Sequence, residues 1–273
     1  MSPEHAQTVL RKNLALDSTC LNRKVLIDLY EPDGLSASKE TGFLLVNDGQ
    51  DLVTMNFDRI LEELLEQGLV RPLVCIGIHA GTDRKMEYGV AGTPDFKGRG
   101  GMAAAYSSFI LTELLPFLRS YYKLETLPPL SYAGFSLGAL MALDMVWCHS
   151  RFFDKAGVFS GSLWWRSIDQ TDPGYNDDLH RIMHQRIRSG IFQPGLKFFF
   201  QCGNKDETND RNNNGIIDSI DDTRDLIKEL VEKGYRVPED IAYLEMEDGA
   251  HDVPTWARAF PAFLKWAFGT VEG

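Results

Sequence analysis

The sequence has few cysteines and no arrangement of them that indicates disulfides. Cys20, Cys75, Cys148 and Cys202 are widely spaced and form no C-x-x-C pair, so no disulfide framework is indicated. Cys75 and Cys202 lie inside apolar runs of strand length. Because free cysteine is readily buried, we expect reduced thiols in the core.

Long apolar segments and excess positive charge are also absent. No stretch approaches the roughly 18 uninterrupted apolar residues of a membrane span, and Met1-Ser-Pro-Glu-His lacks the basic and apolar regions of a secretory signal. We therefore expect a cytoplasmic protein. The 28 Lys and Arg residues against 39 Asp and Glu give a formal net charge of −11, which repels phosphate backbones and anionic lipid surfaces. A small-molecule partner is expected, not nucleic acid or a membrane, and no pattern indicates an oligomeric state.

The composition is that of an ordinary globular domain. Of the 273 residues, 44% are hydrophobic and 25% are charged, which excludes disordered and collagen-like classes. There is no internal repeat and no long linker rich in Pro, Gly or Ser. Since α/β folds often reach this length as one unit, we predict a single domain over residues 1–273.

Apolar runs of strand length alternate with amphipathic segments of helix length along the chain. This alternation predicts an α/β fold in which helices cover both faces of a mostly parallel sheet. Eight strands are predicted at residues 7–16, 24–30, 41–47, 73–79, 130–134, 156–159, 197–202 and 241–246. The first two are joined by a short polar stretch, which favours an antiparallel hairpin. Helices are predicted at residues 56–67, 103–121, 137–148, 177–189, 220–233 and 253–268.

A candidate nucleophile follows the fifth predicted strand. Gly134-Phe-Ser136-Leu-Gly138 lies between that strand and a helical pattern, the context of a G-x-S-x-G nucleophile elbow. Such a turn strains the serine backbone, and glycine two residues to either side leaves room for close approach of the chain. Ser136 is therefore the predicted nucleophile, and the Leu137 N–H at the helix N-terminus is a predicted oxyanion donor. A glycine-bounded turn that only needs a small polar residue is the alternative.

A serine nucleophile needs a general base that is oriented by a carboxylate. In α/β-hydrolases these groups follow in the order Ser, acid, His. His251, between the last predicted strand and the last helix, is the predicted base, and a histidine that only caps that helix is the alternative. Asp206 and Glu207 follow the seventh strand; Asp206 is favoured as the acid and Glu207 stays open. Histidines in helical segments are expected to be solvated: His149, His180 and His184.

Five segments together resemble a known family. They are GFSLG at residues 134–138, NDGQDL at 47–52, CGNKD at 202–206, SGSLWW at 160–165 and GAHD at 249–252 with Trp256. As a set they look like the putative esterase (esterase D-like) family of α/β-hydrolases, which includes enterochelin esterases, S-formylglutathione hydrolases, feruloyl and acetyl xylan esterases and mycobacterial mycolyltransferases. The resemblance spans roughly residues 24–268 and implies the α/β-hydrolase fold.

The resemblance implies a serine carboxylic-ester hydrolase that needs no organic cofactor. Ser136 would attack the acyl carbonyl, His251 would carry the proton and Asp206 would support the imidazolium. The substrate would be a small-molecule, siderophore or carbohydrate-linked ester, and fold-level analogy does not select among these. Acyl transfer on the same triad and a catalytically silent ligand-binding homologue are the alternatives.

Further site residues are implied by the same resemblance. The Gln50 N–H would be the second oxyanion donor, with a simple turn as the alternative. Arg84 and Glu87, in an R-x-x-E-Y segment, and the pair Trp164 and Trp165 would contact the substrate, or else serve as packing residues. Residues 81–102 hold six glycines and form either a mobile rim over the cleft or a surface insertion.

The segment DRNNNGIIDSID at residues 210–221 resembles a calcium loop. EF-hand-like loops place oxygen ligands at positions 1, 3, 5, 7, 9 and 12, with glycine at position 6. The corresponding ligands would be Asp210, Asn212, Asn214, the Ile216 carbonyl, Asp218 and Asp221. Position 12 is Asp instead of Glu and no entering helix precedes the loop, so a solvated turn is the alternative. Calcium here would be structural and would hold the loop that begins four residues after Asp206.

Overall fold

The computed structural model describes residues 8–270, whose eight strands form one sheet. The strand order is β1-β2-β4-β3-β5-β6-β7-β8, which confirms the predicted eight-stranded α/β fold. The strands are β1 (Val9–Ser18), β2 (Arg23–Pro32), β3 (Gly42–Asn47), β4 (Leu73–Ile78), β5 (Leu130–Phe135), β6 (Phe153–Phe159), β7 (Lys197–Lys205) and β8 (Ile241–Ala250). Gln7, where the first strand was predicted to begin, lies outside the described residues.

The pairing of the strands brings one set of strand ends together. β1 and β2 form the predicted antiparallel hairpin, and β2 is also antiparallel to β4. All other neighbouring strands are parallel. Because parallel strands end at the same edge of a sheet, the turns after β3, β5, β6, β7 and β8 lie along one edge. β5 lies between β3 and β6, in the middle of that edge.

All six predicted helical segments are present, two of them subdivided. The elements are α1 (Asp51–Thr54), α2 (Phe57–Glu66), α3 (Arg84–Glu87), α4 (Ala103–Phe109), the π-helical η1 (Ile110–Leu114), α5 (Leu115–Tyr121), α6 (Leu137–Cys148), α7 (Asp177–His180), α8 (Ile182–Ser189), α9 (Asp218–Lys233) and α10 (Val253–Phe268). The four-residue helices α1 and α3 were not predicted because a single turn carries no periodic pattern. No helix within residues 8–270 has the length and apolar character needed to cross a bilayer.

Arg181 separates α7 from α8 in the segment predicted as one helix. Its backbone is extended, with φ −75° and ψ 106°. The guanidinium is buried and donates to Asp222 and Asp225, each at 2.8 Å. We attribute the break to this contact, since the buried cation needs these carboxylates as partners.

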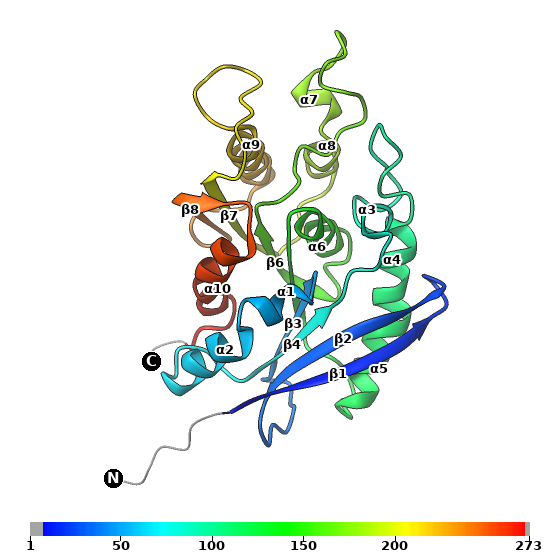
Figure 1. The fold of residues 1–273 in the computed structure, drawn as a ribbon, viewed down its shortest axis with the longest axis vertical. Helices are drawn as coiled ribbons and strands as arrows, with labels where there is room; N and C mark the ends of the chain where they lie inside the picture. The colour runs from blue at the N-terminus through cyan, green and yellow to red at the C-terminus, as the bar shows by residue number, and fades with distance from the viewer. Residues whose placement is uncertain (1–7, 271–273) are drawn as a thin grey trace.

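Two helical layers enclose the sheet. α2 and α10 pack on one face, and α4 to α6, α8 and α9 pack on the other, as Figure 1 shows. In α10 the buried residues recur at helical spacing and include Phe260, Phe263 and Leu264. Phe260 contacts the rings of Phe57, Phe135, Phe159 and Phe263, at centroid distances of 5.0–5.9 Å.

The four cysteines are free thiols, as predicted, but the expected core position holds only for Cys75 and Cys202, since Cys148 is exposed and Cys20 is half-buried. Cys75 and Cys202 are buried in β4 and β7. Burial raises the pKa of Cys202 to about 12, and its sulfur lies 3.1 Å from the Thr223 hydroxyl. These two thiols therefore act as packing groups.

We expect Leu264→Ala to lower the free energy of unfolding by about 2–5 kcal/mol, because it removes a fully buried side chain and leaves a cavity. Leu179→Ala is the matched control, since Leu179 is 65% exposed, and it should change stability by less than about 0.5 kcal/mol. Urea unfolding of both variants measures the difference. Equal losses would contradict the assignment of α10 to the core.

Candidate active site

Ser136 occupies a strained turn between β5 and α6. Its φ is 54° and its ψ is −117°, a conformation that costs free energy for a residue other than glycine. The Ser136 N–H donates to the Phe159 carbonyl at 2.9 Å, and its own carbonyl accepts from the Ser162 N–H at 3.0 Å. The turn is thereby fastened to the end of β6, and the Ser136 side chain is partly exposed.

Glycine is required on both sides of this turn. A Cβ on Gly134 would lie 2.4 Å from the Gly138 carbonyl oxygen. A Cβ on Gly138 would lie 2.6 Å from Asp48 Oδ2 and 3.0 Å from the Asn47 Cβ. The backbone of α6 can therefore approach β5 and β3 only with glycine at these positions, which is the physical reason for the G-x-S-x-G spacing.

Two backbone N–H groups next to Ser136 have no protein acceptor. Val46 of β3 pairs with Ala133 of β5, so Gln50 and Leu137 each lie four residues past this residue pair. Within residues 8–270, neither the Gln50 nor the Leu137 N–H donates to a protein group. The Gln50 side chain accepts from the Ala80 N–H at 3.1 Å, which anchors the turn. The free donors are of the kind that stabilises an oxyanion.

Asp206 lies just after β7 with one carboxylate oxygen buried and unpartnered. Oδ2 accepts from the Gly203 N–H at 3.1 Å, while Oδ1 has no hydrogen-bond partner. Burial raises the pKa of Asp206, and the Gly203 N–H, the Ser160 hydroxyl and the charge of His251 oppose that rise. A buried free acceptor can receive an N–H from a neighbouring imidazole.

His251 follows β8 and precedes α10. Its ring lies 5.4 Å from the Trp256 ring, edge to face. Loss of solvent lowers the pKa of His251, the negative charge of Asp206 raises it, and the Arg84 cation lowers it. The structure thus brings His251 within electrostatic reach of Asp206 and Arg84. The imidazole has no hydrogen bond to another side chain within residues 8–270 in this conformation.

Ser160 connects the acid to α10, a role that the sequence did not reveal. Ser160 is buried with φ 44°, and its oxygen accepts from Trp256 Nε1 at 3.0 Å. Because an indole N–H can only donate, the Ser160 proton is free to reach Asp206, whose pKa it lowers. Ser162 Oγ lies 3.3 Å from Ser136 Oγ. Both serines belong to the SGSLWW motif, and this motif was the only feature of the sequence that pointed to them as site residues.

Arg84 is held beside the serine turn by a bidentate ion pair. Its Nε and Nη2 donate to the two oxygens of Asp48 at 2.6 and 2.7 Å, and Nη2 also donates to the Phe135 carbonyl at 3.3 Å. The Asp48 side chain is 3% exposed and the Arg84 side chain 32%. The pair ties the end of β3 to the end of β5, and leaves one side of the guanidinium open to solvent.

Glu87 and Trp165 occupy packing positions. Glu87 is 1% exposed and accepts from Arg23 Nε and Nη2, both at 2.6 Å. Trp165 is fully buried, and a Cβ on Gly89 or Gly100 would lie 2.9 or 2.8 Å from its Cζ2. Substrate contact would require these side chains to be uncovered. The two glycine contacts also attach the 81–102 segment to the body of the protein.

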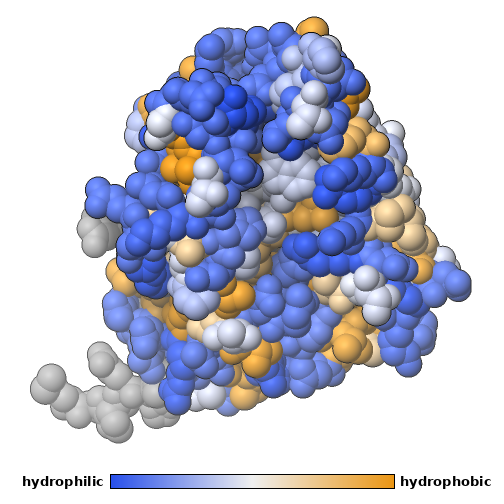
Figure 2. Space-filling view, turned by 45° about the horizontal axis from the view of Figure 1, so that its top comes forward, coloured by the Kyte–Doolittle hydropathy of each residue, from blue (hydrophilic) through white to orange (hydrophobic). Residues whose placement is uncertain are grey.

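Trp164, in contrast, lines a pocket of about 330 Å³. The pocket also includes Glu207, the neighbour of Asp206, and residues of the 81–102 segment. In Figure 2 the top of the view in Figure 1 is turned toward the viewer; the visible surface is mostly hydrophilic with small, separate hydrophobic patches. The structure therefore places Trp164 and Glu207, the neighbour of Asp206, in one polar depression.

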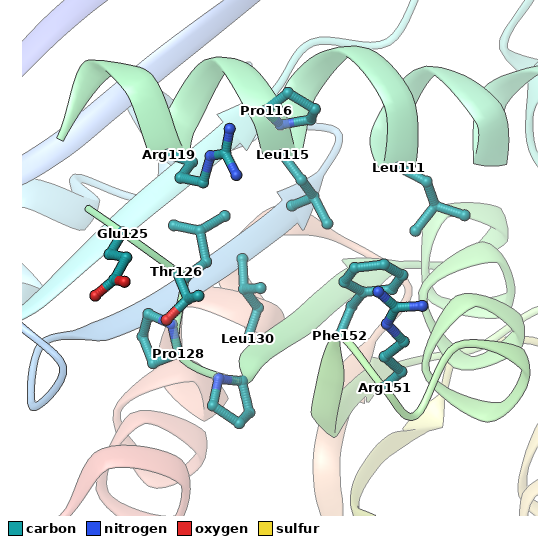
Figure 3. A pocket seen from close by; sticks show the side chains of 12 residues that line it. Leu111, Leu115, Pro116, Arg119, Glu125, Thr126, Pro128, Leu130, Arg151 and Phe152 are labelled. Atoms are coloured by element: carbon teal, nitrogen blue, oxygen red, sulfur yellow. The ribbon is translucent and has the colours of Figure 1, made fainter. Parts of the chain in front are cut away.

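A second pocket, of about 400 Å³, lies at the opposite edge of the sheet. Figure 3 shows its apolar lining of Leu111, Leu115 and Phe152, with Arg119 and Arg151 at its margin. The pocket adjoins Leu130, the first residue of β5, whereas Ser136 follows the last residue. Its lining contains no Ser, Cys or His, so it lacks the groups for the chemistry of the serine turn.

The predicted calcium loop is closed by its own hydrogen bonds. Gly215 has φ 85°, as a turn at position 6 requires. Asp221 Oδ2 accepts from the Asn212 and Asn214 amides at 2.9 and 2.7 Å, and Asp218 pairs with Arg211 at 3.3 Å. Within residues 8–270 no group of three or more His, Cys, Asp or Glu side chains is arranged to hold a metal ion. Calcium binding stays a prediction.

The prediction that His184 is exposed to solvent was wrong. His184 is fully buried between α8 and α9, where Nε2 bonds to the Asp222 carbonyl at 2.8 Å. Burial, aided by the Arg181 cation, lowers the pKa of His184 to about 3. The neutral ring is therefore part of the packing between these helices.

The comparison with protein families decides the classification. A family model described as Esterase, "Putative esterase", matches residues 18–267. The chain belongs to this esterase family. The membership confirms the resemblance predicted from the five motifs. A comparison with curated proteins gives no match.

Solved structures of esterases share the fold of this family member. The enterobactin esterase FES from Shigella flexneri is 18% identical, with a TM-score of 0.73 over 96% of this chain and 59% of that one. An IroE-like serine hydrolase from Shewanella oneidensis is 20% identical, with a TM-score of 0.69 over 95% and 80% of the two chains. A ferulic acid esterase is 16% identical, with a TM-score of 0.68 over 96% and 98%. The chain thus spans about three fifths of the length of the Shigella protein.

We expect Arg84→Met to destabilise the protein by about 3 kcal/mol, because it leaves the Asp48 carboxylate buried without its partner. Adding Asp48→Asn should restore much of that loss, since the uncompensated charge is then removed. Arg59→Met is the control for an exposed pair, because the Arg59 side chain is 77% exposed. Chemical denaturation of wild type, Arg84→Met, Asp48→Asn, the double variant and Arg59→Met would reveal the coupling, and strictly additive losses would contradict it.

Proposed function

We propose that this esterase is a serine carboxylic-ester hydrolase in which Ser136, His251 and Asp206 form the catalytic triad. The observation that carries the proposal is the strained Ser136 turn, flanked by the unpartnered N–H groups of Gln50 and Leu137. Strain of this kind persists where the surrounding structure enforces it, and it is typical of functional sites.

In the proposed first step, Ser136 Oγ attacks the acyl carbonyl and His251 accepts the hydroxyl proton. The Gln50 and Leu137 N–H groups stabilise the negative oxygen of the tetrahedral intermediate. Collapse of the intermediate breaks the ester C–O bond, and His251 gives its proton to the leaving alcohol. Water then repeats the sequence on the acyl-enzyme, releases the acid and restores Ser136. No organic cofactor enters these steps.

Asp206 is the proposed acid in preference to Glu207. The charge of Asp206 acts directly on the pKa of His251, and its buried Oδ1 is free to accept an imidazole N–H. Glu207 instead accepts from the Asn209 amide at 3.0 Å and lines the neighbouring pocket. The Ser160 hydroxyl supports the ionised form of Asp206, which the imidazolium needs as its partner.

The proposed substrate is a small-molecule ester, bound at the polar depression beside Trp164. The related structures include an enterobactin esterase and a ferulic acid esterase, so an ester with an aromatic acyl group is a reasonable first substrate for assay. Trp164, which is half-buried and lines the pocket, is the aromatic side chain proposed to contact such a group.

A fluorophosphonate should label folded protein on Ser136 and leave heat-denatured protein unlabelled, because only the folded turn activates the hydroxyl. Ser136→Ala should lose the label and lower kcat on an activated ester by about 10⁴- to 10⁶-fold. Ser108→Ala, on an exposed face of α4, is the control and should behave like wild type. Mass spectrometry of the digested adduct locates the label.

Two other outcomes of this experiment would each support a different function. Folded protein without an adduct would indicate a silent ligand-binding homologue. An adduct on Ser136 together with acceptor-dependent ester formation would indicate acyl transfer instead of hydrolysis.

The pH dependence of kcat/KM should follow His251. Protonated His251 cannot accept the Ser136 proton, so activity is present above the pKa of His251 and is lost as the pH falls through it. Partial desolvation of the ring by its surroundings lowers that pKa from 6.5, which places the acidic midpoint below 6.5. Asp206→Asn removes a charge that raises the pKa, so the midpoint should move lower still and kcat should fall by about 10⁴-fold.

Glu207→Gln is the matched control for Asp206→Asn, and it should leave the midpoint and kcat near the wild-type values. Rate profiles between pH 4 and pH 9 separate the two carboxylates. A large loss in Glu207→Gln alone would assign the acid to Glu207.

A further inference from the structure

We propose that the pocket beside the serine turn binds an anionic group, a carboxylate, carried by the ester substrate. This inference rests on the proposed function. The pocket is lined from three segments, at residues 96–99, 164–170 and 207–218. Its two distinctive groups are the cations of Lys97 and Arg166, which have no carboxylate bonded to them.

Two residues of the pocket lining follow proposed site residues closely in the chain. Trp164 lies two residues after Ser162, whose oxygen is 3.3 Å from Ser136 Oγ. Glu207 directly follows Asp206 in the turn after β7. A substrate with its acyl carbon at Ser136 therefore extends either its acyl or its alcohol half into the pocket.

The Arg166 guanidinium lies beside two aromatic rings, but no carboxylate within residues 8–270 forms a salt bridge with its charge. Its guanidinium lies 5.8 Å from the Trp164 ring centroid and 5.7 Å from that of Tyr175. Nη1 donates to the neutral Gln170 amide at 2.5 Å, while Nε is buried and has no hydrogen-bond partner. Within residues 8–270, Arg166 forms no salt bridge. A buried guanidinium N–H without an acceptor is costly, and a ligand oxygen would satisfy it.

Lys97 provides the second cation without a salt bridge, although both cations act on the nearby carboxylate of Asp169 and lower its pKa after its bonds from Thr171. The Lys97 ammonium lies 5.2 Å from the Phe96 ring and makes no salt bridge to any residue between 8 and 270. The side chain is exposed, so it can turn toward a ligand. Lys97 and Arg166 stand out because the whole chain carries a formal net charge of −11.

The other charged groups of the pocket have partners or hydrogen-bond donors of their own. Arg99 pairs with Asp95, and Asp218 pairs with Arg211. Asp169 accepts from the Thr171 N–H and hydroxyl.

Glu207, on the wall next to Asp206, differs from these groups because burial raises its pKa. Its carboxylate is therefore held less firmly in the ionised form than that of an exposed glutamate. The cations free to act on a ligand are thus Lys97 and Arg166.

The charges of Lys97 and Arg166 favour a ligand that carries a carboxylate. Arginine and lysine form charge-assisted hydrogen bonds to carboxylate oxygens, and these are stronger than bonds between neutral groups. The face of Trp164 can cover the apolar part of the same substrate half. A neutral ester of equal size leaves both cations unpaired, so it should bind less well.

The test compares matched pairs of esters. p-Nitrophenyl hemisuccinate and p-nitrophenyl butyrate place the carboxylate or a neutral chain on the acyl half. 4-Carboxyphenyl acetate and 4-carbamoylphenyl acetate do the same for the alcohol half. Wild-type protein should show a kcat/KM about tenfold higher for the acidic member of one pair, and the pair that responds identifies the half in the pocket.

Lys97→Gln and Arg166→Gln should each raise KM for the acidic ester by about tenfold and leave the neutral ester unchanged. The preference should also weaken as salt is added, because Lys97 is exposed. Arg151→Gln, in the pocket at the opposite edge of the sheet, is the matched control and should leave both esters unchanged. Equal rates for acidic and neutral esters in wild type, or equal effects of the variants on both, would overturn the inference.

A binding measurement separates this inference from the proposed function. Calorimetric titration of the Ser136→Ala protein with p-nitrophenyl hemisuccinate and with 4-carboxyphenyl acetate needs no turnover. Binding of either acid that is weakened about tenfold by Lys97→Gln supports the anion site, even if no ester is hydrolysed. Hydrolysis of the neutral esters with no charge-dependent binding supports the function and removes the anion site.

Discussion

The close backbone contact between β3, β5 and the start of α6 is the constraint on which the candidate site depends. Gly134 and Gly138 allow the chain to pass at distances where any Cβ would clash with a backbone atom or with Asp48. The contact holds Ser136 at a positive φ and leaves its side chain accessible. It also aligns the turn after β3 with the first residue of α6, so that the Gln50 and Leu137 N–H groups remain free beside the serine.

Buried polar contacts hold the other site elements at the same edge of the sheet. The Asp48–Arg84 pair joins the end of β3 to the Phe135 carbonyl of β5. Ser160, just after β6, accepts from Trp256 of α10, and Asp206 after β7 accepts from the Gly203 N–H. Since an unpaired buried donor or acceptor is costly, these contacts restrict how far each turn can move. The rigid sheet edge therefore positions Asp206 and His251, although they come from separate loops.

Charge separates the surroundings of the site from the rest of the molecule. The chain is acidic as a whole, yet the pocket beside Ser136 contains two cations without bonded carboxylates. Trp164 lines this pocket, with Arg166 5.8 Å from its ring centroid. Trp165, one residue later, is buried against Gly89 and Gly100. One aromatic residue of the pair thus faces the pocket, and the other attaches the glycine-rich segment to the core.

The sequence by itself determined the order of strands and helices and the position of the serine turn, because these follow from local periodicity and from glycine spacing within a few residues. It also placed Asp206 and His251 after strands that end at one edge. Only the tertiary structure decided that Ser160 accepts from Trp256, that Glu87 pairs with Arg23, that His184 is buried and that Arg166 forms no salt bridge within residues 8–270. These outcomes depend on contacts between segments that are far apart in the chain. The exposure and the partners of a side chain are set by the residues that pack against it, and the local spacing of residues in the sequence does not encode that packing.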